Sequence, residues 1–202
     1  AKIIVCLRNP VERAISAYKY FIRTLQEDYN FSDALDRERN GLLKTFTELS
    51  NNTYVEHGFY TQQLADYRKL FPSENIHYVF FEELTNKQLQ IDVMEKLLTF
   101  LEVTPKDFKF SYSHMNFSGE PKYKSLNFLI KKSQFSKKIK HFIPFKLRKR
   151  IIKNIEQHNI STKTIIVDIN EEERNFLKTI YSHQIDELSD LTGKDIHKLW
   201  KL

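Results

Sequence analysis

The sequence predicts an α/β protein in which helices flank a parallel central sheet. Two short apolar runs, Ile3–Leu7 and Ile76–Phe81, have the composition of buried strands. Segments with apolar residues at helical spacing follow both runs. Strands that alternate with helices favour parallel pairing, and such sheets bind ligands at the carboxyl ends of their strands.

In the opening segment, AKIIVCLRNPVERAISAYKYF, the first expected strand leads directly into a helix. The run Ile3–Leu7 has no polar alternation, which indicates a strand covered on both faces. Pro10 suits a first helical position, and apolar residues recur at helical spacing from Val11 to Ile22. Because the N–H groups and the dipole at a helix N-terminus favour negative charge, we expect an anion to bind beside Arg8.

The remaining elements follow from periodicity and turn residues. The polar segment Phe31–Asn52 is expected to be helical in part, with a break at Asn40-Gly41. Apolar spacing predicts three further helices, over Gly58–Phe71, Leu89–Leu101 and Asn170–Leu191. The expected buried face of the first of these helices comprises Leu64, Tyr67, Leu70 and Phe71. Pro72 should end that helix, and Gly193 should cap the last one.

Length and composition indicate a single globular domain. The chain has 202 residues, four Gly, 16 Phe and 10 Tyr, a composition unlike that of disordered or linker-rich chains. Its single cysteine, Cys6, excludes an internal disulfide framework and is expected in the core. No apolar run of membrane-spanning length and no signal peptide is present, so we expect a soluble, cytoplasmic segment. A chain that begins inside a strand suggests that further sequence precedes Ala1.

The net charge of +6 is unevenly distributed. No acidic residue lies between Glu120 and Glu156, whereas apolar and basic residues interleave from Lys131 to Lys153, which we call the basic stretch. Its basic residues are Lys131, Lys132, Lys137, Lys138, Lys140, Lys146, Arg148, Lys149, Arg150 and Lys153. It is interpreted as a solvated amphipathic helix pair, an anionic-glycan track or a peripheral membrane contact. Nucleic acid is disfavoured because no nucleic-acid-binding motif accompanies the charge.

The segment around Arg8-Asn9-Pro10, with Arg13 and Ser16, resembles a motif of sulfotransferases that use 3′-phosphoadenosine 5′-phosphosulfate (PAPS). In that family, the arginine at the strand end and a serine eight residues later hold the 3′-phosphate of the nucleotide. Arg8 and Ser16 have this spacing. A guanidinium can grip phosphate oxygens, and a hydroxyl two turns into the helix can add one short hydrogen bond.

Three further segments extend the resemblance. GFYTQQLADYRKLFPSENIHYVFFEEL is similar to a family segment that runs from a G-x-Y motif to an acidic pair and Leu. YSHQIDELSDLTGKDIHKLW is similar to the family's usual C-terminal end, and HMNFSGEPKYKSL to a loop of its bacterial and carbohydrate-type members. Together the segments cover most of the chain in the family's order. The resemblance implies a single sulfotransferase domain over 1–202 with a P-loop-NTPase-like three-layer fold.

One part of the family pattern has no match in this sequence. Family members carry an N-terminal loop that grips the 5′-phosphosulfate and supplies a lysine, and no G-x-x-x-x-G-K-[ST] motif occurs here. The sequence is therefore expected to be the C-terminal two-thirds of the domain, without its N-terminal part. The 3′ half of the donor site would be present, and a general base could lie upstream.

The resemblance also suggests other site residues. Phe81 would pack near the adenine, or serve as an ordinary core residue. Lys122 and Lys124 could close over the 3′-phosphate or lie solvated, and Glu82 is expected to be a structural anchor that bonds backbone N–H groups. His57 is the candidate general base, with a packed or surface role as the alternative. His114 and Asn116 could shape the acceptor pocket, and no metal site is expected because the histidines lack ligand spacing.

The function implied is transfer of a sulfuryl group from PAPS to a hydroxyl or amine, with 3′,5′-ADP as the product. The basic stretch favours a carbohydrate acceptor, specifically an anionic saccharide. Two alternatives stay open at this point. One is a P-loop kinase-like phosphotransferase, because a strand-Arg-helix unit is a general phosphate cradle. The other is a non-catalytic module that binds an anionic glycan or a membrane.

Overall fold

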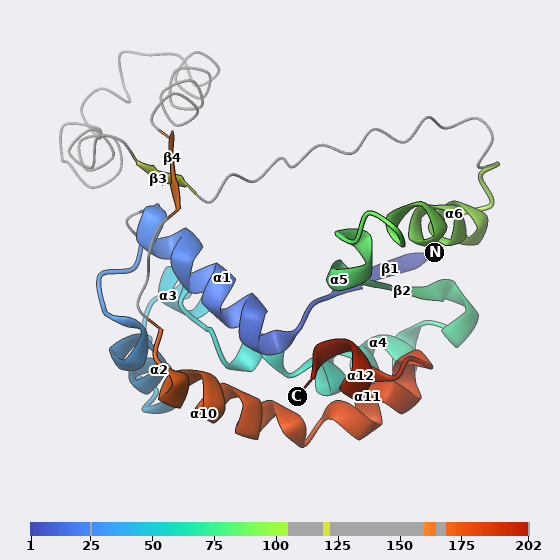
Figure 1. Cartoon of the computed structure of the whole chain (residues 1–202). Coiled ribbons are helices and arrows are strands. Elements are labelled where there is room, and N and C mark those ends of the chain that lie inside the picture. Colours follow the sequence, from blue (N-terminus) through green and yellow to red (C-terminus); the bar gives the residue numbers. More distant parts are fainter. Residues whose placement is uncertain (25, 105–118, 122–159, 165–168, 202) are drawn as a thin grey trace, which may run out of the picture. The chain divides into compact units, whose positions relative to one another are not determined.

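The structure is a computed structural model that describes residues 1–24, 26–104, 119–121, 160–164 and 169–201 (Figure 1). Within these residues the chain forms two compact units. The first unit takes in 1–14, 55–104 and 170–201, and the second takes in most of 15–54 together with 119–121 and 160–164. The basic stretch, Lys122, Lys124, His114 and Asn116 lie outside the described residues, so the expectations for them stay predictions.

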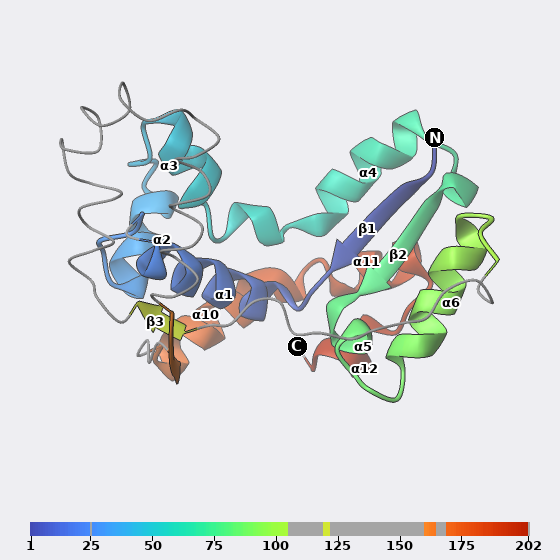
Figure 2. The same ribbon diagram turned by 90° about the horizontal axis from the view of Figure 1, so that it is seen from above.

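The first unit is built on a pair of parallel strands. Strand β1 (Ile3–Leu7) pairs with β2 (Ile76–Phe80) in the register Ile3↔Ile76 to Leu7↔Phe80. Figure 2 shows the two strands side by side. Parallel pairing was predicted from the alternation of strands and helices, and it is confirmed. It brings the carboxyl ends of both strands to the same edge of the sheet.

Helices lie on both faces of the strand pair, as predicted. Helix α6 (Gln90–Phe100) lies on one side, and α4 (Tyr60–Leu70), α11 (Ile185–Thr192) and α12 (Ile196–Trp200) lie on the other (Figure 1). The core forms on the side of α4, α11 and α12, because the apolar residues of these helices meet the strands there. Its buried members are Leu7, Tyr60, Leu64, Phe80, Ile185, Leu188, Ile196 and Trp200.

The other face of the strand pair is covered only in part by the described residues. On β2, His77 stacks on Phe100 of α6 with ring centroids 5.0 Å apart, and Val79 is buried. On β1, Ile4 is 45% exposed and Cys6 is exposed. The predictions that β1 is covered on both faces and that Cys6 is a core residue are therefore wrong for the described residues. An apolar strand composition cannot tell which helix will cover which strand.

Cys6 nevertheless lacks the environment of a nucleophile. The protein around its inner side partly buries the thiol, and this desolvation raises its pKa. The negative charge of Glu82 raises the pKa further. Since the thiolate is the reactive form, both effects disfavour nucleophilic chemistry at this residue.

The helix predicted over Gly58–Phe71 is shorter in the structure and buries a different face. A 3₁₀ turn, η1 (Glu56–Gly58), comes first, and α4 begins at Tyr60. Tyr60 and Leu64, one turn apart, are its buried residues. Tyr67 and Leu70 were expected on the buried face but are exposed, Leu70 to 77%. The core thus contacts only the first half of this helix.

The long helix predicted over Asn170–Leu191 is two helices, α10 (Glu171–Ser182) and α11. Asn170 and Glu173 form a capping box at the start of α10. The break falls at His183 and Gln184, where the buried Gln184 side chain bonds a distant part of the backbone instead of facing solvent. No Gly or Pro marks this break in the sequence. Gly193 was predicted to cap the helix over Asn170–Leu191. The prediction is confirmed for α11, the second of the two helices, since Gly193 follows it with a left-handed φ of 68°.

Two short elements connect the layers of the first unit. The 3₁₀ turn η2 (Ser73–Asn75) follows Pro72 and precedes β2. Helix α5 (Phe81–Leu84) starts at the residue after β2. This places the FFEEL segment at the carboxyl edge of the strand pair.

The second unit packs around buried tyrosines. It contains most of α1 (Pro10–Arg23), α2 (Phe31–Arg39), α3 (Phe46–Asn51) and the antiparallel pair β3 (Gly119–Pro121) and β4 (Ile160–Thr164). The expected break at Asn40-Gly41 is confirmed, since α2 ends there and Gly41 has a φ of 63°. Tyr18, Phe31 and Tyr54 contact one another, and the Tyr54 hydroxyl donates to the buried Glu27 carboxylate at 2.8 Å. Burial raises the pKa of Tyr54, so this hydroxyl stays a donor.

We predict that Gly58→Ala destabilises the protein. A Cβ at position 58 would lie 2.4 Å from the hydroxyl oxygen of Tyr181, whose ring is fully buried. The clash should lower the free energy of unfolding by roughly 1–3 kcal/mol in urea titration. Tyr181→Leu, which removes the clashing ring, should make the loss from Gly58→Ala clearly smaller. An unchanged unfolding midpoint in Gly58→Ala would contradict this packing.

Candidate functional site

The candidate site lies at the carboxyl ends of β1 and β2. Arg8 follows β1 directly, and Phe81 follows β2 and begins α5. Because Leu7 and Phe80 are paired in the sheet, the next residues lie beside each other. The Arg8 guanidinium carbon lies 4.5 Å from the centroid of the Phe81 ring, within the range of a cation–π contact. The predicted parallel pairing of the strands brings these two residues together.

The N-terminus of α1 is closed by its own cap. The Asn9 side-chain oxygen accepts hydrogen bonds from the N–H groups of Val11 at 3.0 Å and Glu12 at 3.3 Å. The N–H of Arg13 donates to the Asn9 carbonyl oxygen at 2.8 Å, and Pro10 has no N–H. The expectation that backbone N–H groups of this helix bind an anion is therefore wrong. Positive charge at this edge comes from side chains, Arg8 first among them.

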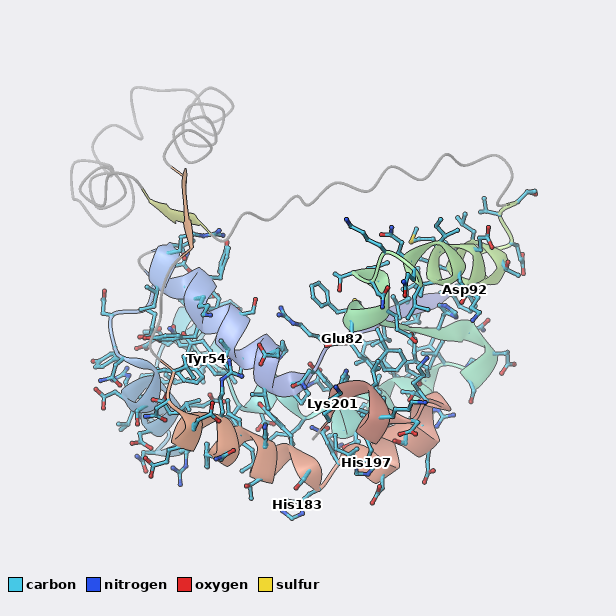
Figure 3. All side chains as sticks on the ribbon, in the orientation of Figure 1. Tyr54, Glu82, Asp92, His183, His197 and Lys201 are labelled. Atoms are coloured by element: carbon cyan, nitrogen blue, oxygen red, sulfur yellow. The ribbon has the colours of Figure 1, made fainter. Side chains whose placement is uncertain are left out.

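Glu82 joins three segments of the first unit in a closed ring of hydrogen bonds. One carboxylate oxygen accepts from the backbone N–H of Asn9 at 2.8 Å, and the other accepts from the indole N–H of Trp200 at 3.1 Å. The Asn9 side-chain amide completes the ring by donating to the Trp200 carbonyl oxygen at 3.1 Å. Figure 3 labels Glu82 on α5 and Lys201 directly after α12. Glu82 is the structural anchor that was predicted, and Trp200, 5% exposed, packs into the core.

Tyr60, the first residue of α4, also bonds the backbone just after β1. Its hydroxyl donates to the Arg8 carbonyl oxygen at 2.9 Å. The ring is 8% exposed, and this burial raises the pKa of Tyr60, so the phenol stays protonated as a donor. The buried Gln184 side chain accepts from the Tyr60 N–H at 2.8 Å and donates to the Gly58 carbonyl oxygen at 2.7 Å. The start of α4 is thereby fixed to the turn between α10 and α11.

A cavity of about 270 Å³ lies elsewhere in the first unit. It is lined by residues of β2 and α6 and by Thr192 and Lys194. Two ion pairs lie in its wall: Lys96 with Asp92 at 2.8 Å, and Lys194 with Glu83. Neither Arg8 nor Phe81 belongs to its lining. The cavity is therefore distinct from the strand-end site.

The other predicted site residues are placed as follows. Ser16 lies on α1, about two turns after Pro10, and belongs to the second unit. His57 lies in η1 and is exposed. The roles proposed for both residues stay predictions.

Sequence reasoning missed the polar residues that hold the strand end. Gln184 reads as one more polar residue of a helix, although it is 4% exposed and bonds two backbone groups. Asn9 directly before Pro10 is a typical helix cap, a signal that was present in the sequence. The role of the Tyr60 hydroxyl could not be predicted, because Tyr60 and Arg8 are 52 residues apart.

Comparison with known proteins identifies the family and the fold. Residues 1–173 match the sulfotransferase domain family. The chain belongs to this family. Its structure is similar to the crystal structure of a sulfotransferase from Alicyclobacillus acidocaldarius, with a TM-score of 0.63 and 21% sequence identity. The similarity covers 100% of this sulfotransferase-family chain but 58% of the bacterial protein. A search of curated proteins gives no match.

The mostly helical α/β structure with a parallel strand pair agrees with the predicted sulfotransferase fold. In the part of the chain that the structure describes, no helix is long and apolar enough to cross a bilayer. Within the same residues, no three potential metal ligands among His, Cys, Asp and Glu gather at one place.

We predict that Glu82→Ala is strongly destabilising because it leaves two donors, the Asn9 N–H and the Trp200 indole N–H, without their acceptor. An unsatisfied buried donor costs about 1–3 kcal/mol, and urea titration should show a loss of this size or larger. Trp200→Phe, which removes one donor and keeps an aromatic ring, serves as the matched variant. In the Trp200→Phe background, the further loss from Glu82→Ala should be smaller. Equal losses in both backgrounds would mean that the two residues are not coupled.

Proposed function

We propose that this chain is the C-terminal part of a PAPS-dependent sulfotransferase and that it holds the 3′ half of the donor nucleotide. Family membership supports sulfuryl transfer in general. The observation that carries the choice of donor is the position of Arg8, a cation at the carboxyl edge of a parallel strand pair. Ligands bind at this edge in open α/β sheets, and an arginine there suits a phosphate dianion.

The reaction proposed is an in-line transfer. An acceptor oxygen or nitrogen forms a bond to sulfur while the bond between sulfur and the bridging phosphate oxygen breaks. The products are a sulfated acceptor and 3′,5′-ADP, and the acceptor proton passes to a base. His57 is the candidate for that base on this chain. Arg8 would not touch the sulfur; it anchors the far end of the nucleotide, and this binding energy holds the sulfuryl group in register.

We assign the nucleotide contacts residue by residue. Arg8 binds the 3′-phosphate, and Ser16 adds a hydroxyl from the following helix, in keeping with the spacing of eight residues. Phe81 packs near the adenine while its ring also contacts the Arg8 guanidinium, which leaves one ring face for the base. Lys122 and Lys124 add positive charge close to the 3′-phosphate. Because the Asn9 side chain already bonds the first N–H groups of α1, we expect these side chains to supply the affinity for the 3′-phosphate.

For the acceptor we propose a carbohydrate, specifically an anionic saccharide, recruited by the basic stretch. Ten basic residues with no acidic residue among them create a positive field that reaches about one Debye length, roughly 8 Å at physiological salt. Such a field concentrates a polyanion without entering the reaction. Peripheral contact with an anionic membrane is the second use proposed for the same charge. We propose a cytoplasmic location.

We predict that Arg8→Ala weakens binding of 3′,5′-ADP by about 2–4 kcal/mol, because a charge-assisted contact is lost. Adenosine 5′-phosphate, which lacks the 3′-phosphate, should bind poorly to the wild type and lose little more in the variant. Isothermal titration calorimetry on the full-length protein measures both. Equal losses for the two nucleotides would contradict the assignment of Arg8.

The same titration separates the proposed donor from that of a kinase-like phosphotransferase. A PAPS enzyme should bind 3′,5′-ADP in preference to ADP and ATP, since only the former carries the 3′-phosphate. Preference for ATP would favour phosphoryl transfer.

We predict that the basic stretch acts on acceptor binding alone. Replacing Lys137, Lys138, Lys140, Arg148, Lys149 and Arg150 with Gln should raise the acceptor KM and flatten its salt dependence, with kcat nearly unchanged. Affinity for 3′,5′-ADP should hardly change. Loss of binding to anionic vesicles with normal kinetics on a soluble acceptor would favour the membrane contact. Unchanged kinetics and unchanged vesicle binding would show that the stretch is an ordinary solvated surface.

A further inference from the structure

We propose that Tyr60 and Glu82 are positioning residues that fix the peptide group between Arg8 and Asn9 and thereby aim the Arg8 side chain at the 3′-phosphate. The inference rests on the proposed function for its ligand. It assigns a role in phosphate recognition to two residues that need not touch the nucleotide themselves.

The peptide group between Arg8 and Asn9 is bonded by side chains at both of its polar atoms. Its carbonyl oxygen accepts from the Tyr60 hydroxyl at 2.9 Å. Its N–H donates to the Glu82 carboxylate at 2.8 Å. A peptide group is planar, so two bonds at opposite sides fix the orientation of the plane. The Cα of Arg8 lies in this plane, and the preceding residue, Leu7, is held in the sheet by its pairing with Phe80. With the backbone restrained on both sides of this Cα, the direction in which the Arg8 side chain leaves the backbone is restrained as well.

This peptide group needs such support because it lies between two regular elements. The ladder with β2 ends at Leu7, which pairs with Phe80. Backbone bonding within α1 begins with the Asn9 carbonyl oxygen, which accepts from Arg13. The Arg8 carbonyl and the Asn9 N–H belong to neither pattern. Buried or half-buried backbone groups in such positions require side-chain partners, and Tyr60 and Glu82 provide them.

Both partners are themselves held in place. The Tyr60 backbone N–H donates to Gln184, and the Tyr60 ring packs near the Trp200 ring with centroids 6.1 Å apart. The Trp200 indole donates to Glu82. We call the contacts of Tyr60, Glu82 and Phe81 with Arg8 and its following peptide group the clamp around Arg8. Tyr60 and Glu82 are held by the C-terminal helices, and the ring of Phe81 contacts the guanidinium. A guanidinium fixed before the ligand arrives loses less entropy on binding, which raises affinity for the phosphate.

The test compares two tyrosines that make the same kind of bond. Tyr60→Phe removes the hydroxyl that donates to the Arg8 carbonyl. Tyr181→Phe is the matched control, since the Tyr181 ring is also buried in the first unit and its hydroxyl donates to the Val55 carbonyl at 2.9 Å. Both variants should lower the melting temperature by similar amounts. Only Tyr60→Phe should weaken binding of 3′,5′-ADP, by about fivefold, while adenosine 5′-phosphate changes less than twofold.

A double-mutant cycle separates positioning from general damage. If Tyr60 acts through Arg8, then Tyr60→Phe should have no further effect on 3′,5′-ADP affinity in the Arg8→Ala background. Glu82→Gln, which exchanges one acceptor oxygen for a donor group, should behave in the same way as Tyr60→Phe. Isothermal titration calorimetry on the full-length protein gives all of these affinities.

The outcomes are distinct for the two proposals. If the wild type prefers 3′,5′-ADP and Arg8→Ala abolishes that preference, but Tyr60→Phe matches Tyr181→Phe in affinity, the positioning role is overturned and the proposed function stands. An equal loss from Tyr60→Phe in the presence and absence of the Arg8 side chain also overturns it. If the wild type shows no preference for 3′,5′-ADP, the proposed function fails and this inference fails with it.

Discussion

The carboxylate of Glu82 is the group on which the geometry of the strand ends depends. It accepts one hydrogen bond from the segment after β1 and another from the end of α12, while it belongs to the segment after β2. A neutral side chain of the same length has one acceptor oxygen, whereas a carboxylate has two. The two donors that meet here, a backbone N–H and an indole N–H, bond different oxygens of the side chain, an arrangement that suits a carboxylate better than an amide. This explains on physical grounds why a half-buried acid follows the end of β2.

The capped helix limits the ways in which the proposed site would recognise a phosphate. In many α/β proteins the anion receives its hydrogen bonds from a helix N-terminus. In this chain Asn9 and Pro10 leave the first turn of α1 without N–H groups for a ligand. Recognition then depends on side-chain charge, and side chains need support to be oriented. The clamp around Arg8 and the absence of a backbone cradle at this helix are thus two aspects of one arrangement.

Much of the fold followed from the sequence because its signals are local. Runs rich in β-branched and aromatic residues predicted the two strands, Pro10 the start of α1, and Gly193 the end of α11. The strand ends also gave Arg8 and Phe81 as neighbours, since parallel strands end at one edge. What could not be predicted depends on long-range packing. The exposure of Ile4 and Cys6, the break at Gln184 and the bond from Tyr60 to Arg8 are all decided by segments far away in the chain.

The Asn9 side chain bonds the Trp200 carbonyl across a separation of 191 residues, which has a consequence for synthesis in the cell. A ribosome makes roughly 5–20 residues per second, and the strand end emerges many seconds before its last partner. During that interval Glu82 and Tyr60 are already available, but the indole N–H and the C-terminal helices are not. The nascent chain can pair β1 with β2, yet the ring of hydrogen bonds closes only after translation has passed Trp200. The geometry of the strand end is therefore completed late, and a nascent chain in which translation stalls before Trp200 would keep an unfinished strand end.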